Sequence, residues 1–183
     1  MITWYGEKLC DYGYLINLKN REDRYKRARK NLRKSKIFGV KRFEAILMTE
    51  PSYIKYGCTQ SHIEIAKKQI KNNWEYVLYL EDDIVMDFFY DLDTDNTKID
   101  KETIAKNIIK ELNEFKPDVL WLGVRPESET EKITDTLVLA NKTLMSHAYI
   151  GSLNYAKFLV KHLKYRESEN FSRNWPIDYS YRK

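Results

Sequence analysis

Three consecutive carboxylates, Glu81, Asp82 and Asp83, are the side chains with the clearest capacity for chemistry in this chain. They directly follow the apolar run 76–80, which has the length and composition of a buried strand. In an extended chain Glu81 and Asp83 face one side and Asp82 faces the other. Clustered carboxylates need a compensating cation, and their hard oxygens suit Mn²⁺ or Mg²⁺. We therefore expect a metal site here; the alternative is a solvated acidic turn.

A second polar set follows the first predicted strand, residues 12–18. Asn17 lies at the end of that strand, and Arg21 and Arg24 come shortly after it. In doubly wound sheets, ligands bind at the carboxyl ends of the strands, and arginine can hold a phosphate there through two parallel hydrogen bonds. The simpler interpretation of both arginines is an ordinary basic helix N-terminus.

Ser61, His62 and His147 complete the candidates. Ser61 and His62 are adjacent, so on a helix they point in different directions, and no Gly-x-Ser-x-Gly elbow surrounds the serine. We expect the pair to hold a binding-site loop rather than to act as a nucleophile and base, and a purely structural His62 is equally compatible. His147 is either a late metal ligand or a histidine at the edge of the core, and we prefer the second interpretation.

Alternating strands and helices must position these side chains. Strands are expected at 12–18, 42–46, 76–80 and 119–123, with 136–140 and 145–150 as a strand pair. Helices are expected at 21–35, at 59–72 with Thr59 as N-cap, at 101–115 and at 152–163. This order predicts an α/β fold with a mostly parallel central sheet, formed by residues 1–183 as a single domain.

Charge is unevenly distributed along the chain. The net charge is only +5, but residues 19–42 hold twelve Lys and Arg against two acids. Such a segment suits phosphates or an anionic membrane surface, so peripheral membrane contact stays open. It has no aromatic stacking platform or recognised reader motif, and we therefore expect no nucleic-acid partner.

The two cysteines, Cys10 and Cys58, do not make a disulfide framework, and we expect reduced thiols. The first residues lack the apolar core of a signal peptide, and no apolar stretch approaches the roughly 20 residues of a membrane span. These features favour the cytoplasm or the cytosolic face of a membrane.

Three motifs resemble glycosyltransferase family 25, which contains bacterial lipooligosaccharide galactosyltransferases and animal collagen galactosyltransferases. Residues 14–24 are similar to its apolar strand followed by Asn-Leu and Arg-x-Asp-Arg. Residues 57–62 match its Gly-Cys-x-x-Ser-His segment, and residues 80–83 contain its Glu-Asp-Asp. Order and separations also agree. Looser similarity continues at 118–123 and 147–150, so the resemblance spans residues 14–163.

The resemblance implies a GT-A-like (Rossmann-like) sandwich and inverting transfer of galactose or glucose from a UDP-sugar, with Mn²⁺ or Mg²⁺. The implied acceptor is a glycan or a glycoprotein such as a collagen-like chain. Glu81-x-Asp83 then corresponds to the Asp-x-Asp metal motif of GT-A enzymes, with both residues at the metal. The remaining nucleotide-sugar contacts are assigned to Asn17 at the base, Arg21 and Arg24 at phosphate or uracil, and Ser61, His62 and Asp82 around them.

An inverting transfer needs a base for the acceptor hydroxyl, and carboxylates usually serve. Asp178 is the candidate, because the family often has a Pro-x-Asp near its acceptor side; a plain loop aspartate is the alternative. The chain stops soon after Asp178, where family members often continue. The alternative function is therefore a catalytically degenerate relative that binds a nucleotide sugar or a glycan.

Overall fold

The computed structural model describes residues 1–48, 54–84, 100–126, 130–134, 136–140 and 143–163. Its strands are β1 (Ile2–Trp4), β2 (Glu7–Cys10), β3 (Tyr12–Asn17), β4 (Ile37–Phe38), β5 (Lys41–Glu44), β6 (Tyr76–Glu81), β7 (Val119–Pro126), β8 (Thr130–Lys132), β9 (Val138–Ala140) and β10 (Thr143–Ser152). Its helices are α1 (Glu22–Lys34), α2 (Ile54–Asn72), α3 (Lys101–Phe115) and α4 (Leu153–His162). Asp178 lies outside the described residues.

A five-stranded mixed sheet forms the centre of the molecule, in the order β5-β3-β6-β10-β7. β3 runs parallel to β5 and β6, whereas β10 runs antiparallel to β6 and β7. The α/β class is therefore confirmed, and the sheet is mixed: β5, β3, β6 and β7 point the same way, and β10 is reversed. The connection from β6 through α3 leads to β7, which lies two positions from β6 in the sheet. β10 occupies the position between them and runs antiparallel to both.

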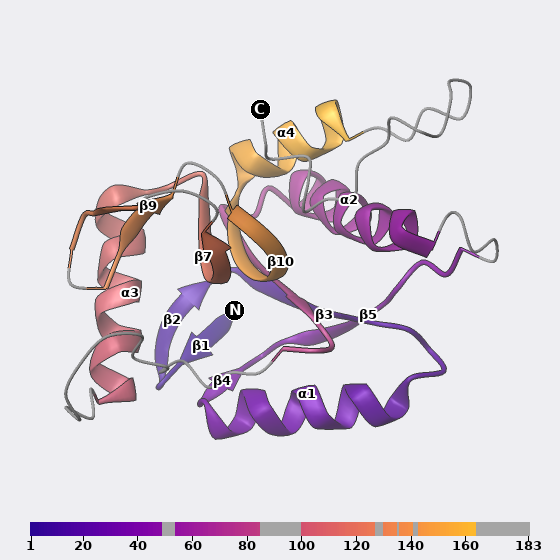
Figure 1. Cartoon of the computed structure of the whole chain (residues 1–183), viewed down its shortest axis with the longest axis horizontal. Coiled ribbons are helices and arrows are strands. Elements are labelled where there is room, and N and C mark those ends of the chain that lie inside the picture. The colour runs from indigo at the N-terminus through magenta and orange to yellow at the C-terminus, as the bar shows by residue number, and fades with distance from the viewer. Residues whose placement is uncertain (49–53, 85–99, 127–129, 135, 141–142, 164–183) are drawn as a thin grey trace.

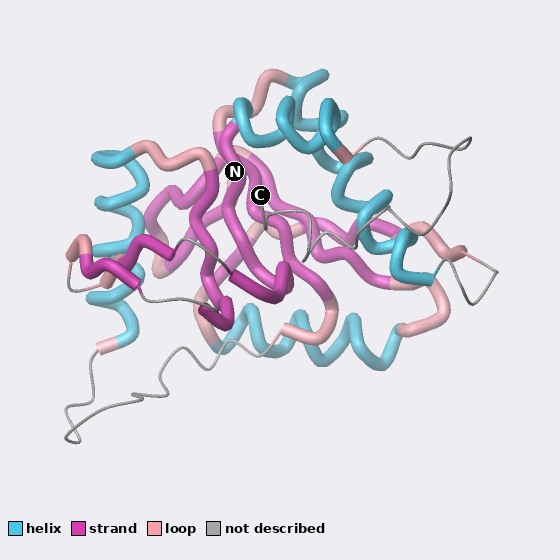
Figure 2. Tube along the Cα trace, turned by 45° about the horizontal axis from the view of Figure 1, so that its top comes forward, coloured by secondary structure: helices cyan, strands magenta, loops and turns pink. Residues whose placement is uncertain are grey.

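Helices cover both faces of this sheet (Figure 1). Alternate residues of β6 supply the two hydrophobic cores, with Leu78 and Leu80 on one face and Val77 and Tyr79 on the other. The Val77 face packs against α2 and α4, and the Leu78 face packs against α1, α3 and the small sheet β2-β1-β4. Figure 2 shows the strands lying between the two groups of helices. Both faces of the β6 strand are therefore buried up to the acidic residues at its end.

Local capping explains the helix bounds that the sequence predicts well. Asp100 accepts hydrogen bonds from the backbone N–H groups of Glu102 and Thr103, and α3 ends at Lys116 in the left-handed region, immediately before Pro117. Ser152 accepts from the N–H of Tyr155 and begins α4. These side chains satisfy amide donors that the first helical turn leaves without partners.

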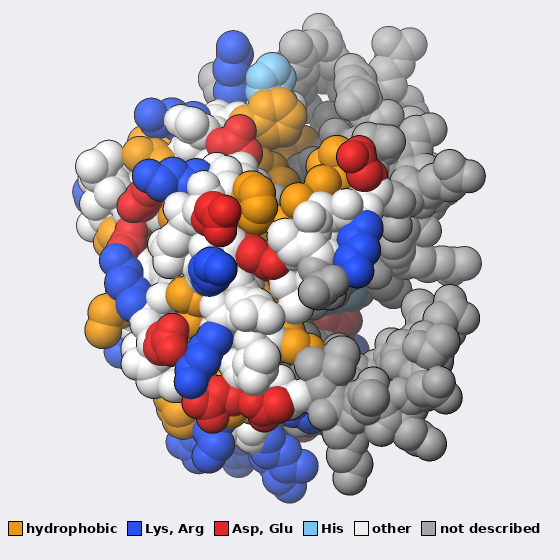
Figure 3. Space-filling view, turned by 90° about the vertical axis from the view of Figure 1, so that its left-hand side faces the viewer, with side chains coloured by type: hydrophobic (Ala, Val, Ile, Leu, Met, Phe, Trp, Pro, Cys, Tyr) orange, Lys and Arg blue, Asp and Glu red, His pale blue; other side chains and the backbone are white. Residues whose placement is uncertain are grey.

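Helix α1 has acidic residues in its first turn and basic residues in its last, which complements the helix dipole. Ala28 and Leu32 are its buried residues, and the remaining faces are highly charged. Its exposed basic side chains are Lys26, Arg27, Arg29, Lys30, Arg33 and Lys34. Figure 3 shows Lys and Arg side chains gathered along the lower edge of the molecule, where Figure 1 has α1.

Two local expectations are wrong, and one pair of strands was not expected. Thr59 does not cap α2, because the helix begins five residues earlier at Ile54 and Thr59 is buried within it. The strands near 136–140 and 145–150 do not pair with each other, since β9 pairs with β8 and β10 joins the central sheet. The β1–β2 hairpin was not expected; Tyr5 and Gly6 both have positive φ, as a tight two-residue turn requires.

No helix in the described part of the chain is long and apolar enough to cross a membrane. Neither Cys10 nor Cys58 forms a disulfide, as expected.

Candidate functional site

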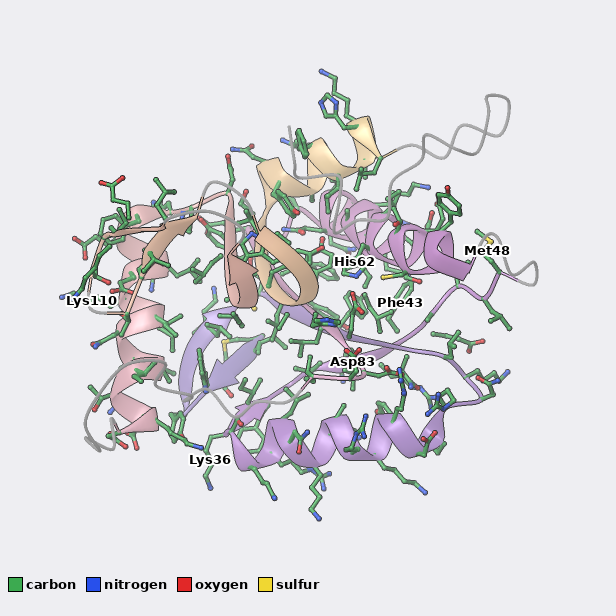
Figure 4. The ribbon with its side chains drawn as sticks, in the orientation of Figure 1. Lys36, Phe43, Met48, His62, Asp83 and Lys110 are labelled. Carbon is green, nitrogen blue, oxygen red and sulfur yellow. The ribbon has the colours of Figure 1, made fainter. Side chains whose placement is uncertain are left out.

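The candidate site lies where β3 and β6 end side by side. These strands are parallel neighbours, and Ile16 pairs with Glu81, so the residues that follow each strand meet at the same edge of the sheet. Helix α2 passes above this edge and contributes His62, while Asp83 follows β6 (Figure 4). The structure thus brings Asn17, Arg24, His62 and the carboxylates of 81–83 together, as the sequence predicts.

Asp82 faces the arginine side of this edge and is buried. One of its oxygens accepts from Asn17 Nδ2 at 2.7 Å, and the other accepts from Arg24 Nη1 at 3.0 Å. The charge of the carboxylate is therefore balanced by a guanidinium, and both oxygens have donors. Asp82 fixes the turn after β6 to the start of α1.

Asn17 is the centre of this arrangement and is almost fully buried. Its amide nitrogen donates to the Arg21 carbonyl oxygen at 2.9 Å as well as to Asp82, and its oxygen accepts from Arg42 Nη2. An amide has two N–H donors, so both are in use. The side chain orients its neighbours in this structure. Arg42, which the sequence analysis did not single out, also stacks over Tyr25 at 4.4 Å and pairs with Glu22.

Arg21 lies at the surface rather than in the Asp82 network. Its guanidinium pairs with Asp23 through two contacts of 3.0 Å and 2.9 Å, and its backbone forms the N-cap position of α1. The hydrogen bond with Arg21 keeps the pKa of the exposed Asp23 carboxyl at about 2, below its usual value. Arg24, about one third exposed, connects the buried Asp82 with the surface.

Two residues of the 57–62 motif hold α2 against the loop after β5. A Cβ on Gly57 would lie 2.3 Å from the Ile46 carbonyl oxygen, so only glycine permits this approach. Ser61 Oγ donates to the Gly57 carbonyl at 2.7 Å and accepts from the Ile46 N–H at 2.9 Å. The contacts of this buried serine are thus with the protein backbone, as a role in holding the loop requires.

The cysteine and the histidine of the Gly-Cys-x-x-Ser-His motif face Glu81. Cys58 and His62 are four residues apart and share one face of α2. Cys58 Sγ and His62 Nε2 each lie 3.4 Å from Glu81 Oε1. His62 is fully buried and lies nearly parallel to the rings of Tyr79 and Tyr149, which stack on each other. Its Nδ1 contacts the Tyr149 hydroxyl at 2.8 Å. The motif therefore has a packing face and a chemical face.

His147, Glu81 and Asp83 form a second group on the same side. His147 comes from β10, where the pairing of Ala148 with Leu80 carries it beside Glu81. Its Nδ1 lies 3.0 Å from Asp83 Oδ1 and 3.5 Å from Glu81 Oε2. Our preference for a core-edge histidine is not supported, because the ring faces both carboxylates.

Ionisation follows this arrangement. Contact with Asp83, and then with Glu81, raises the pKa of His147 to about 10 despite partial burial. Burial opposes ionisation of Glu81, but His147 and His62 outweigh it and hold the pKa of its carboxyl well below the ordinary value. Carboxylate oxygens of Glu81 and Asp83 therefore face His147 Nδ1, and Glu81 also faces His62 Nε2.

This second group has the composition of a divalent metal site. One donor atom from each of Glu81, Asp83 and His147 lies within 4.8 Å of the others. Asp83 Oδ1 and His147 Nδ1 are buried, yet within the described structure neither makes a hydrogen bond of acceptable geometry, although they are 3.0 Å apart. Buried polar atoms normally have partners, and two carboxylates with one imidazole suit Mn²⁺. The donor set thus fits the expected cation, and His147 is an additional candidate ligand.

The sequence of the chain was compared with known proteins. A search of the curated proteins found no match. The sequence model of glycosyltransferase family 25 (LPS biosynthesis protein) matches residues 48–180, well over half of the chain. This range contains the 57–62 motif, the three carboxylates and His147, whereas Asn17, Arg21 and Arg24 precede it. The chain belongs to glycosyltransferase family 25.

Proposed function

We propose that this member of the family transfers galactose or glucose from a UDP-sugar to a glycan or protein-linked acceptor, with inversion at the sugar carbon. Family membership supports a sugar donor and a glycan acceptor. The observation that carries the finer proposal is the Glu81–Asp83–His147 group at the carboxyl end of β6, with Arg24 nearby. The mixed sheet with polar residues at one strand edge supports a GT-A-like fold.

The chemistry of the donor explains why such a group is needed. Cleavage of the sugar–phosphate bond leaves a nucleoside diphosphate, whose developing negative charge must be stabilised. A bound Mn²⁺ or Mg²⁺ supplies that stabilisation as a Lewis acid. Glu81, Asp83 and His147 would hold the ion; their side chains are partly exposed, but the facing atoms Asp83 Oδ1 and His147 Nδ1 are shielded from water.

The arginine side of the site has a supporting role in this proposal. Asp82 is fixed by Asn17 and Arg24, so the turn keeps Glu81 and Asp83 on the opposite side. Arg24 is partly exposed and Arg21 more so, which allows either guanidinium to approach a diphosphate; Arg21 would exchange its surface partner Asp23. Asn17 acts through these neighbours, because its amide is fully engaged.

The acceptor hydroxyl must lose a proton as it attacks. Asp178 stays our candidate for this base, on the strength of the Pro-x-Asp resemblance alone. Ser61 is excluded from that role in our account, since its hydroxyl donates to the Gly57 carbonyl.

A donor panel tests the proposal. The protein is incubated with UDP-galactose, UDP-glucose and control UDP-sugars, with and without Mn²⁺, and UDP release is followed. We expect metal-dependent release from one hexose donor, lost in Asp83→Asn and retained in Glu102→Gln, whose carboxylate pairs with Lys106 at the surface of α3. UDP binding without turnover would indicate the degenerate relative. Absence of UDP binding at any metal concentration would contradict both functions.

A further inference from the structure

The two oxygens of Glu81 face different groups of side chains. Oε2 lies toward His147, in the metal group described above. Oε1 lies toward Cys58 and His62, each at 3.4 Å. Cys58, His62 and Glu81 offer one sulfur, one nitrogen and one oxygen atom within 4.8 Å of one another. This donor set differs in kind from the oxygen-rich set on the other side.

The separations match those of a tetrahedral zinc shell. Zinc binds thiolate at about 2.3 Å and imidazole or carboxylate at about 2.0–2.1 Å, so tetrahedral ligands lie about 3.3–3.6 Å apart. The distances from Cys58 Sγ and His62 Nε2 to Glu81 Oε1, both 3.4 Å, fall in that range. The His62 contact is long for a hydrogen bond from an imidazole N–H to a carboxylate, which prefers about 2.7–2.9 Å. The Cys58 contact has a length at which a thiol donates a hydrogen bond to the carboxylate.

His62 is prepared as a ligand rather than as a hydrogen-bond donor. Its ring is fully buried and packs beside the rings of Tyr79 and Tyr149, which stack on each other. Nδ1 contacts the Tyr149 hydroxyl, an oxygen partner of the kind that orients metal-bound histidines. Nε2 points at Glu81 and makes no hydrogen bond to any residue that the structure describes. A metal cation bound to this buried nitrogen would supply the partner that His62 Nε2 does not have among the described residues.

The helix supplies the required spacing. Cys58 and His62 are separated by three residues on α2, so both side chains project from one face toward the end of β6. The close packing at Gly57 and the hydrogen bonds of Ser61 fix the distance between α2 and the sheet edge. Cys10, the other cysteine, lies in β2 and belongs to the core on the opposite face.

We propose that Cys58, His62 and Glu81 form a second metal site, selective for a thiophilic divalent ion such as Zn²⁺. On binding, the Cys58 thiol loses its proton to solvent and the thiolate coordinates the ion, with water in the fourth position. Glu81 bridges this site and the oxygen-rich one through its two oxygens. The inference does not depend on sugar transfer, because the three ligands are present without donor or acceptor.

Cobalt titration of the metal-free protein, without a sugar nucleotide, tests the proposal. Co²⁺ reports a thiolate ligand through a sulfur-to-metal charge-transfer band in the near ultraviolet. We expect this band in wild type and in Cys10→Ser, its absence in Cys58→Ser, and its loss when Zn²⁺ is added. Circular dichroism verifies that each variant is folded.

A measurement on the wild type alone covers the case in which Cys58→Ser does not fold. X-ray absorption at the zinc edge of the loaded protein should show one sulfur at about 2.3 Å together with nitrogen and oxygen ligands. Absence of a sulfur ligand in that spectrum, or a charge-transfer band that persists in Cys58→Ser or disappears in Cys10→Ser, overturns the proposal. Because no donor is used, failure here leaves the UDP-sugar result unaffected, and the reverse also holds.

Discussion

An aspartate lies on each side of the turn after β6, but the two carboxylates differ in their hydrogen bonds. On one side Asp82 has an amide and a guanidinium on its two oxygens, and it is charge-balanced. On the other side Asp83 Oδ1 and His147 Nδ1 are buried without hydrogen bonds in the described structure, and so is His62 Nε2. The paired side holds the fold together, whereas the other side is arranged for a ligand.

The difference teaches how a run of three carboxylates can serve two purposes. The alternation of an extended chain separates Asp82 from Glu81 and Asp83. Arginines from the start of α1 and from β5 gather on the Asp82 side, while histidines from α2 and β10 gather on the other. Substitutions on the two sides should therefore change different observables, with the largest effect on catalysis.

The largest expected effect is that of removing His147, on the side of the turn that holds Glu81, Asp83 and His147, the ligand side. His147→Ala should lower metal-dependent UDP-sugar turnover by more than about 100-fold, because loss of a ligand exceeds the roughly 10–100-fold effect typical of residues that only orient ligands. The matched control is His162→Ala, since His162 lies at the end of α4 against Phe158. Equal activities of the two variants in a metal titration of turnover would remove His147 from the site.

Removal of Asp82 should act mainly on stability. Asp82→Ala leaves the buried Asn17 amide and the Arg24 guanidinium without their acceptors, and we expect a loss of about 2–4 kcal/mol in the free energy of unfolding in urea. Asp23→Ala breaks a surface pair with Arg21 and should leave the unfolding midpoint nearly unchanged. If both variants unfold alike, the paired side has no special structural role.

The Gly57 contact sharpens the comparison, because it positions the ligand side without touching a ligand. Gly57→Ala introduces a Cβ that meets the Ile46 carbonyl, so α2 must shift, at a cost of about 1–3 kcal/mol. We also expect weaker cobalt binding to Cys58 and His62. Gln60→Ala, on the same helical turn, is the control, and an unaltered unfolding curve for Gly57→Ala would contradict the packing argument.

The smallest expected effect is that of Ser61. Ser61→Ala removes two hydrogen bonds to backbone groups near Gly57 and Ile46, and leaves the Ile46 amide without its acceptor. We expect a loss of about 1–2 kcal/mol in the free energy of unfolding, with turnover reduced less than fivefold, an estimate that follows from the size of one buried hydrogen bond. A loss of turnover as large as that of His147→Ala would instead indicate direct contact with substrate.

Local signals allowed much of the fold to be predicted. The helix 101–115 was predicted with its observed bounds, because Asp100 caps its start and Pro117 follows its end. The prediction of Thr59 as a cap was wrong, because in sequence a buried threonine within a helix cannot be told from a threonine that caps one. The antiparallel entry of β10 between β6 and β7 depends on pairing between residues about 70 apart, and periodicity carries no information about such partners.

The site was predicted in part for the same reason. Asn17 and Glu81 end strands and Asp83 follows one, so their meeting at one sheet edge could be inferred from the order of elements. His147 could not be placed, because its neighbours depend on the position of β10. Cys58 was seen within its motif without a role, although its spacing from His62 already puts both on one helix face. Arg42 gave no sequence signal that separates it from the other basic residues.

Manganese binding measured by electron paramagnetic resonance tests the comparison between the two sides most directly. Free Mn²⁺ is titrated into wild type, Asp83→Asn and Asp82→Asn, each shown to be folded. Our account predicts saturable binding to wild type and to Asp82→Asn, and its loss in Asp83→Asn, because only Asp83 faces the His147 side. Retention of saturable binding in Asp83→Asn, or an equal loss in Asp82→Asn, would contradict it.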